Sequence, residues 1–446
     1  MPEENDIELI AHLMRRAGFG ADRTQLEELV RIGYENVVEG LVNPPDEAPP
    51  ADEHFLHRRM PYVEVGGATP MPGAANWLFH MMNTERVLEE KMTLFWHQIF
   101  ATSNSKIDND QAMSLQIHMF RENSLGNYRD ILIKLAQDPA MIFWLDNNEN
   151  HKRAPNENWG RELLELFSLG VGNYTEQDVY ECARAFTGWT IRAKIPRSPY
   201  NRFAWNYQFR PEEHDFGQKT FLSHTGDLNG EDIIDIILEQ PACPRFIARH
   251  LYNFFVADEP PVSAWNEQAP RDPEAINTLM AAYFESGGSL QHMLQVLFNS
   301  DFFKDSIGKK VKSPVELVIG TLRLSGEYNN QSKIGPGIYE AIAEAGFMGQ
   351  ELSNPPSVEG WHTGKEWIDS GAMVERINFA ADQVGDIENP GVQRIVERLT
   401  LSNTSFTART LVEACLALAG HVPVSQKRKE ELIDTFQKGG PIAFGS

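Results

Sequence analysis

The chain has 446 residues, of which 41% are hydrophobic, so it is long and apolar enough to bury a large core. Its formal net charge of −23 argues against a nucleic-acid partner, because such binding depends on neutralising phosphates. The same charge disfavours an anionic membrane surface, and no apolar run approaches the ~20 residues that span a bilayer, so we predict no membrane insertion.

The N-terminus and the cysteines bear on the compartment. The first residues, Met-Pro-Glu-Glu-Asn-Asp, are acidic and lack the basic and apolar regions of a signal peptide. The three cysteines are far apart and form no CxxC motif, so neither a disulfide framework nor a zinc ribbon is predicted. We expect a soluble protein that is cytoplasmic as written, and export after removal of a signal stays an open alternative.

Helical periodicity predicts a mainly α-helical fold with one large multi-helix body. Residues 1–42 form an N-terminal helical pair, and the Pro/Gly-rich segment 43–74 is expected to lie over the body as a covering arm. The helical core spans 75–385. It contains a small irregular or β excursion near 190–230, where aromatic residues, arginines and glycines occur without a helical period. C-terminal helices and a tail occupy 386–446.

Several elements of the core can be predicted more closely. One long helix is expected from residue 75 to about 99. A second covers 155–169 and ends at Gly170, because glycine readily adopts the left-handed conformation that terminates a helix. Within the excursion, residues 207–209 and 219–222 are candidate strands.

Glu162 is the principal catalytic candidate. It lies beside the apolar side of helix 155–169, one turn after Asn158 and one turn before Leu166. Partial burial would raise the pKa of this carboxyl group and suit it to general acid or base catalysis. A structural role for Glu162 is the alternative.

Polar residues crowd the start of the same helix: Asp146, Asn147, Asn148, Asn150, Asn156 and Asn158. Such residues commonly form turns and caps. Near a helix N-terminus they can instead bind a hydroxyl-rich or anionic ligand. We therefore consider Asp146, Asn156 and Asn158 as candidate substrate-binding residues.

Two histidines and two cations complete the candidate site. His97 lies in an aromatic helix face that is more typical of a core histidine, whereas His214 lies in the irregular segment beside carboxylates. Either could assist Glu162, and Arg161 and Lys219 would neutralise developing negative charge. No HExxH, GxSxG, Walker or Rossmann motif is present, so the metal content and the cofactors stay unknown.

A series of motifs runs through the chain in a fixed order. They are His12-Leu-Met-Arg-Arg-Ala-Gly-Phe-Gly20, Lys91-Met-Thr-Leu-Phe-Trp-His97, Asp138-Pro-Ala-Met141, Leu145-Asp146, Pro155-Asn-Glu-Asn-Trp-Gly-Arg-Glu-Leu-Leu-Glu-Leu-Phe-Ser-Leu-Gly170, Asn173-Tyr-Thr-Glu-Gln-Asp178, Ala185-Phe-Thr-Gly-Trp189, His214-Asp-Phe-Gly-Gln-Lys-Thr-Phe-Leu222, Lys312-Ser-Pro-Val-Glu-Leu317 and Asn354-Pro-Pro-Ser-Val-Glu-Gly-Trp361. Together they resemble DUF1800, a family of bacterial proteins of unknown function, over about residues 8–385. His362 departs from the family pattern, since many relatives have proline there.

The resemblance implies little about the reaction. Genes of this family often lie beside genes of a second family, DUF1501, which resembles the alkaline phosphatase and sulfatase superfamily. The resemblance therefore implies a phosphatase- or sulfatase-like DUF1501 protein as a partner, by association alone.

Two functions from different classes follow from these features. The first is a hydrolase-like enzyme that acts on a polar substrate, a carbohydrate or an anion, by general acid/base catalysis. The alternative is a non-catalytic binding or partner protein whose polar constellation is a structural network. The enzyme requires Asp146, Glu162, His97 and His214 to line one cleft, whereas the network has them mutually hydrogen-bonded or scattered.

Overall fold

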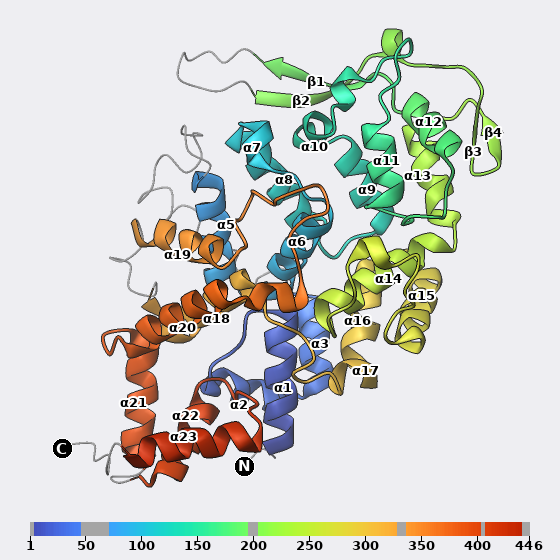
Figure 1. Cartoon of the computed structure of the whole chain (residues 1–446). Coiled ribbons are helices and arrows are strands. Elements are labelled where there is room, and N and C mark those ends of the chain that lie inside the picture. Colours follow the sequence, from blue (N-terminus) through green and yellow to red (C-terminus); the bar gives the residue numbers. More distant parts are fainter. Residues whose placement is uncertain (1–3, 46–70, 195–203, 328–335, 403–405, 439–446) are drawn as a thin grey trace.

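The structure of the chain is a computed structural model that describes residues 4–45, 71–194, 204–327, 336–402 and 406–438. Within these residues helices dominate, and the strands form two small two-stranded antiparallel sheets (Figure 1). The predicted fold class, mainly α with a small β excursion, is confirmed. The expected covering arm lies outside the described residues, except for its two ends.

The helices follow one another with short connections. Before the sheets the chain forms α1 (Glu4–Ala17), α2 (Arg23–Ile32), α3 (Tyr34–Val42), α5 (Met71–Asn83), α6 (Val87–Ile99), α7 (Asn104–Ile107), α8 (Asp110–Glu122), α9 (Tyr128–Ala136), α10 (Pro139–Trp144), the 3-10 turn η1 (Asn147–Glu149), α11 (Asn158–Glu165) and α12 (Glu176–Ala185). After the sheets it forms α13 (Gly230–Glu239), α14 (Ala242–Phe255), η3 (Val262–Ala264), α15 (Pro273–Ser286), α16 (Leu290–Asn299), α17 (Asp301–Lys304), α18 (Pro314–Ser325), α19 (Pro336–Phe347), η5 (Gly364–Ile368), α20 (Ser370–Gly385), α21 (Pro390–Ser402), α22 (Ala408–Leu418) and α23 (Gln426–Lys438).

Side-chain caps explain where many of these helices begin. Asp22, Thr175 and Ser313 each accept a hydrogen bond from the backbone three residues later, in reciprocal capping boxes that start α2, α12 and α18. Such caps satisfy the backbone N–H groups that the first turn of a helix leaves without a partner.

The β excursion consists of two hairpins. β1 (Trp189–Lys194) pairs with β2 (Ala204–Phe209), with Trp189 opposite Phe209, and β3 (Lys219–Phe221) pairs with β4 (His224–Gly226). Residues 207–209 and 219–221 were the predicted strand segments, and the structure adds their partners β1 and β4. In Figure 1 the longer hairpin lies at the opposite end of the molecule from α21, α22 and α23.

Two predicted helices differ from those observed. The single helix expected over 75–99 is two helices, because the chain turns after Asn83 and the Thr84 hydroxyl accepts a hydrogen bond from the Arg86 backbone N–H at 3.0 Å. The helix expected over 155–169 is regular only within α11 and continues as turns to Gly170, whose φ is +80°.

One continuous apolar core runs from Ile7 in α1 to Phe379 in α20. A charged cluster is buried beside it, where Glu316 of α18 contacts Lys91 of α6 and lies 3.2 Å from Nη1 of Arg16 in α1. Lys91 also donates to the Gly18 carbonyl at 2.9 Å. This cluster joins three helices that are far apart in the sequence. Among the described helices, none combines the length and the apolar character needed to cross a bilayer.

Candidate functional site

The polar residues before α11 bind one another. The Asp146 carboxylate accepts from Lys106 at 2.8 Å and from the Asn158 side chain at 3.3 Å. The Asn156 side chain donates to the Asp146 carbonyl at 3.4 Å, and its own oxygen accepts from the Asn158 backbone at 3.0 Å. The structure therefore brings the three predicted substrate-binding residues together, with each engaged by its neighbours.

The adjacent asparagines tie this loop to α12 and β1. The Asn147 side chain donates to the Trp189 carbonyl, and the Asn150 side chain to the Ala183 carbonyl, both at 2.8 Å. Asn150 also accepts from the Asn156 backbone N–H at 2.9 Å. Asn147 and Asn150 are almost fully buried, so these bonds replace bonds to water that folding removes. The arrangement is that of a structural network.

The two candidate cations are also engaged within the protein. Arg161 donates to both carboxylate oxygens of Glu176, at 2.9 and 2.7 Å, and to Glu157 at 3.2 Å. The buried ammonium group of Lys219 donates to the Asp215 and Gly217 carbonyls at 2.5 and 3.1 Å. Both cations thus stabilise local structure.

His214 supports the loop after β2. Its Nδ1 lies 2.7 Å from the Thr187 carbonyl, and its ring contacts Phe209 and Phe216 with centroid distances of 5.3 and 4.6 Å. Burial lowers the pKa of His214. This environment keeps the imidazole neutral and fixes the approach of residue 214 to the end of α12.

His97 lies inside the aromatic core. Its ring contacts Trp77 at 5.4 Å and Trp361 at 5.2 Å, and neither ring nitrogen has a hydrogen-bond partner in the described part of the chain. Burial lowers the pKa of His97 to about 3, so the ring is neutral at physiological pH. Within the described residues, no hydrogen bond, ion pair or ring contact joins His97 to Glu162 or His214.

Glu162 has the environment that its position on the helix predicted. It is half-buried, and no hydrogen bond or ion pair to its carboxylate is found among the described residues. Burial, together with the charges of Glu165 and Glu359, raises the pKa of Glu162 to about 7, although Arg161 opposes the shift. Glu162 is therefore balanced between its two protonation states near neutral pH.

A cavity of about 300 Å³ lies next to this carboxylate. It is lined by residues at the ends of α6 and α11, in α14 and in two loops, namely Gln98, Ile99, Leu166, His250, Asn253, Glu259, Pro260, Pro261, Val262, Pro356, Ser357, Glu359, Gly360, Trp361, His362, Thr363 and Glu366. Leu166 is one helical turn from Glu162, and Glu359 is the lining residue whose charge acts on the pKa of Glu162.

The loop of Glu359 reaches the cavity through a close contact that requires glycine. Gly360 has φ of +86°, and a Cβ atom there would lie 2.3 Å from the Gln98 carbonyl oxygen. Any side chain at this position would force the loop away from α6. The contact places Trp361 against His97, so His97 supports the cavity wall from within the core.

The cavity combines carboxylates with unpaired ring nitrogens. Glu259 is paired with Arg249 at 2.7 Å and Glu366 with His362 at 2.7 Å, whereas the exposed Glu359 carboxylate has no partner in the described chain. The indole nitrogen of Trp361 and Nε2 of His250 are buried and have no partner among the described residues.

Sequence reasoning missed Glu359, Trp361 and His250 as candidate site residues. The Gly-Trp pair at 360–361 stood in a motif of the resemblance, yet nothing in its spacing linked it to Glu162. Among the described residues, no group of three or more His, Cys, Asp or Glu residues is arranged to hold a metal ion.

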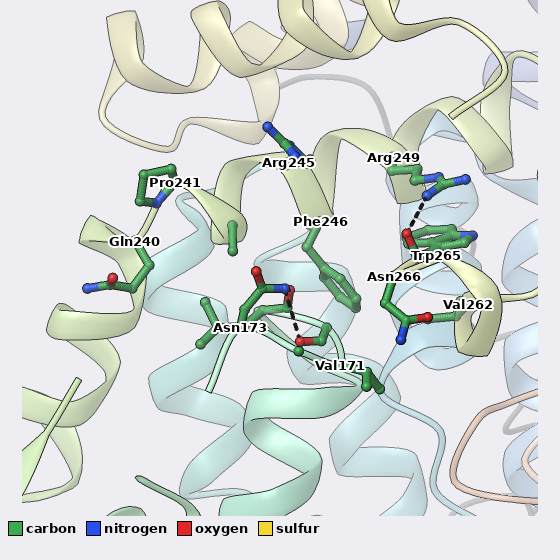
Figure 2. A pocket seen from close by; sticks show the side chains of 14 residues that line it. Val171, Asn173, Gln240, Pro241, Arg245, Phe246, Arg249, Val262, Trp265 and Asn266 are labelled. Atoms are coloured by element: carbon green, nitrogen blue, oxygen red, sulfur yellow. Dashed lines mark hydrogen bonds between the residues drawn. The ribbon is translucent and has the colours of Figure 1, made fainter. Parts of the chain in front are cut away.

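A second cavity of about 510 Å³ adjoins the first, with Val262 lining both (Figure 2). It lies at the start of α14, between the 169–173 loop and Trp265. Arg249 donates to the Trp265 carbonyl at 3.3 Å and to Glu259 at 2.8 Å, so this side chain forms part of the wall between the two cavities. Arg245 of the same helix is exposed at the rim.

Comparison with known proteins gives a family and no activity. No curated protein and no solved structure matches the chain. Residues 12–442 match the family described as "Protein of unknown function (DUF1800)". Because this match covers nearly the whole sequence, the chain belongs to the DUF1800 family.

Proposed function

We propose that this DUF1800 protein is a hydrolase-like enzyme that binds a polar substrate in the 300 Å³ cavity. Glu162 is its general acid or base, and Glu359 is the second carboxylate of the site. The remaining predicted groups, His97, His214 and Lys219, support the fold around this site in the proposed enzyme.

The observation that carries the proposal is the unpaired state of Glu162. A half-buried carboxylate that the protein leaves without a donor is costly, because burial disfavours its charged form. Elsewhere near α11 the charged residues are paired, as Arg161 is with Glu157 and Glu176. A pKa of about 7 is the value that lets a carboxyl group donate and accept protons at neutral pH.

The cavity supports an uncharged, hydroxyl-rich substrate over an anionic one. Its unpaired charge is the negative charge of Glu359, which repels anions. The Trp361 indole nitrogen can donate a hydrogen bond, and Glu359 can accept one, so the lining offers both partners that a sugar hydroxyl needs. A pair of carboxylates with different environments is the usual equipment for glycoside hydrolysis.

The family motifs give further support. Three segments that carry the resemblance, Lys91–His97, Pro155–Gly170 and Asn354–Trp361, meet at this cavity, where His97 contacts Trp361 and Leu166 lies in the lining. Their convergence is a property of the fold, since they are far apart in the sequence.

The test is hydrolysis of a panel of aryl glycosides by the wild type and by three variants. We expect Glu162→Gln to lower kcat by about 10²-fold or more, because amide nitrogen cannot transfer the proton. Glu359→Gln should lower kcat and move the acidic limb of the pH profile to lower pH, since it removes a charge that raises the pKa of Glu162.

Glu165→Gln is the matched control on the same helix. The Glu165 carboxylate accepts from the Tyr174 hydroxyl at 3.0 Å, so this change should keep most of kcat and shift only the pH profile. Full activity in Glu162→Gln would contradict the proposal. A collapse of the melting temperature in that variant would instead assign Glu162 to the structure.

A non-catalytic binding protein is the second candidate, and the 146–158 network favours it, because those residues are engaged by one another. In this function the cavity retains a ligand without turnover. Soluble oligosaccharides would then raise the melting temperature of wild type and Glu162→Gln alike, and no product would form.

We also propose a phosphatase- or sulfatase-like DUF1501 protein as the partner. Co-expression of the two proteins, followed by size-exclusion chromatography, tests it. Elution of a stable complex at the summed mass supports the partnership, and separate elution of both proteins at micromolar concentration contradicts it.

A further inference from the structure

A third cavity, of about 430 Å³, has a charge opposite to that of the molecule as a whole. It lies among α1, α18, α20, α21 and the segment after α22. Four of its lining residues are cations, Arg15, Lys312, Arg323 and Arg394, and Asp22 is the only carboxylate that the lining includes. A chain with a net charge of −23 thus concentrates positive charge at one place.

Part of this charge is held by neutral groups. Nη1 of Arg15 donates to the Gly420 and His421 carbonyls at 3.0 and 3.1 Å. Nη1 of Arg323 lies 3.1 to 3.3 Å from the carbonyls of three residues at the end of α5. Carbonyl oxygens orient these guanidinium groups without cancelling their charge.

Other donors have no partner. Nη2 of Arg15 is buried and without a hydrogen bond, and no hydrogen bond or ion pair to the Lys312 ammonium group is found in the described chain. Burial lowers the pKa of Lys312, and it lowers the pKa of Arg15 to about 10. These shifts express the cost of positive charge that no protein anion neutralises.

The carboxylates around the cavity are already committed. Glu316, which acts on Lys312, is bound by Lys91 and Arg16. Asp22 caps α2 by accepting from the Gln25 N–H at 2.9 Å, and it is 4.0 Å from Arg394. Glu8 acts on Arg15 from the same helix, two turns away. The unpaired donors of Arg15 and Lys312 therefore face the cavity without a dedicated counter-charge.

We infer that this cavity binds the phosphate group of a small soluble phosphomonoester, with Arg15 and Lys312 as its principal ligands. A phosphate dianion matches several cations better than a single carboxylate does, and guanidinium and ammonium groups both bind it well. The volume exceeds that of a bare phosphate ion, and Phe19, Met82 and Val384 offer an apolar wall for the organic part of the ester. The net charge of the chain disfavours a phospholipid in an anionic membrane.

The experiment measures binding of inorganic phosphate and phenyl phosphate to the full chain by calorimetry and by melting temperature, against chloride at equal ionic strength. We expect both phosphates to raise the melting temperature, and phenyl phosphate to bind more tightly. Lys312→Met should weaken phosphate binding about tenfold or more, because it removes one charge-assisted contact. Without phosphate, the same variant should melt at a higher temperature than the wild type, since it removes an unpaired buried charge.

Two further variants keep the inference testable if Lys312→Met does not fold. Arg394→Gln removes an exposed cation at the rim and should weaken phosphate binding several-fold without affecting folding. Lys309→Gln removes one positive charge at an exposed position outside the cavity, and it should leave the affinity unchanged.

Three results would overturn the inference. They are equal stabilisation by phosphate and chloride, equal phosphate affinity in the wild type and both cavity variants, and binding to phosphatidate vesicles without binding to phenyl phosphate. None of these outcomes depends on the cavity at Glu162, so the phosphate site and the proposed hydrolase can fail separately.

Discussion

Burial and neighbouring carboxylates act in the same direction on Glu162, since both raise its pKa from an ordinary 4.5 to about 7. The native state therefore binds the Glu162 proton more tightly than the unfolded chain does. Between these two pH values the native state holds the proton that the unfolded chain has lost, so stability falls as pH rises through this window.

We predict that Glu162→Gln removes this part of the pH dependence. The difference in unfolding free energy between variant and wild type should grow by about 1–2 kcal/mol from pH 4.5 to pH 7.5, less than the full shift implies because the side chain is partly solvated. Urea unfolding at a series of pH values measures it. A difference that stays constant with pH would show that Glu162 titrates normally in the folded protein.

At the scale of elements, the network before α11 joins a loop, a helix and a strand. Asn150 is its centre, with hydrogen bonds to Asn147, to the Ala183 carbonyl and from the Asn156 backbone. Truncating this side chain leaves buried polar groups without partners, and each such group costs about 1–3 kcal/mol.

Asn150→Ala should therefore lower the unfolding free energy by about 3 kcal/mol. Asn148→Ala is the matched control, because the Asn148 side-chain oxygen has no hydrogen-bond partner among the described residues. Chemical denaturation of both variants at one pH compares them. Equal losses in the two would mean that the network contributes little to stability.

At the scale of the whole molecule, Glu316 neutralises Lys91 and Arg16 and thereby joins α18 to α6 and α1. The nearby cations hold the pKa of Glu316 well below its usual range in spite of burial. A depressed pKa gives stability that is present above the unfolded pKa of about 4.5 and is lost as pH falls below it.

Glu316→Gln leaves two buried cations without their anion, so we predict a loss of about 3–5 kcal/mol at neutral pH. The loss should be smaller at pH 3, where the unfolded chain no longer gains from ionising this group. Thermal melts at both pH values check it, with the exposed Glu397→Gln on α21 as control. A variant as stable as the wild type at neutral pH would show that the cluster relaxes or hydrates.

The sequence predicted the fold class because helix formation is written in local patterns, such as the Thr175 and Ser313 capping boxes. It did not predict the break between α5 and α6, where the chain has neither glycine nor proline. The turn at Thr84 depends on a hydroxyl group that many helices accommodate.

The candidate site divides in the same way. The partial burial of Glu162 follows from its place on a helical wheel, which is a local property. Its neighbour Glu359 is almost 200 residues away, and only the packing of the 356–366 loop against α6 brings it near. His214 could not be distinguished from a catalytic histidine, because the Thr187 carbonyl that holds it is also supplied by tertiary structure.

The N-terminal helix finds its partners at the far end of the polypeptide. His12 binds the Phe303 carbonyl and the Ser306 hydroxyl, both at 3.1 Å, and Arg15 reaches Gly420. A ribosome therefore releases α1 first and supplies its contacts last, so the apolar side of α1 is uncovered for most of the time that synthesis takes. Chaperones that shield nascent chains have their longest task on this protein at its first helix.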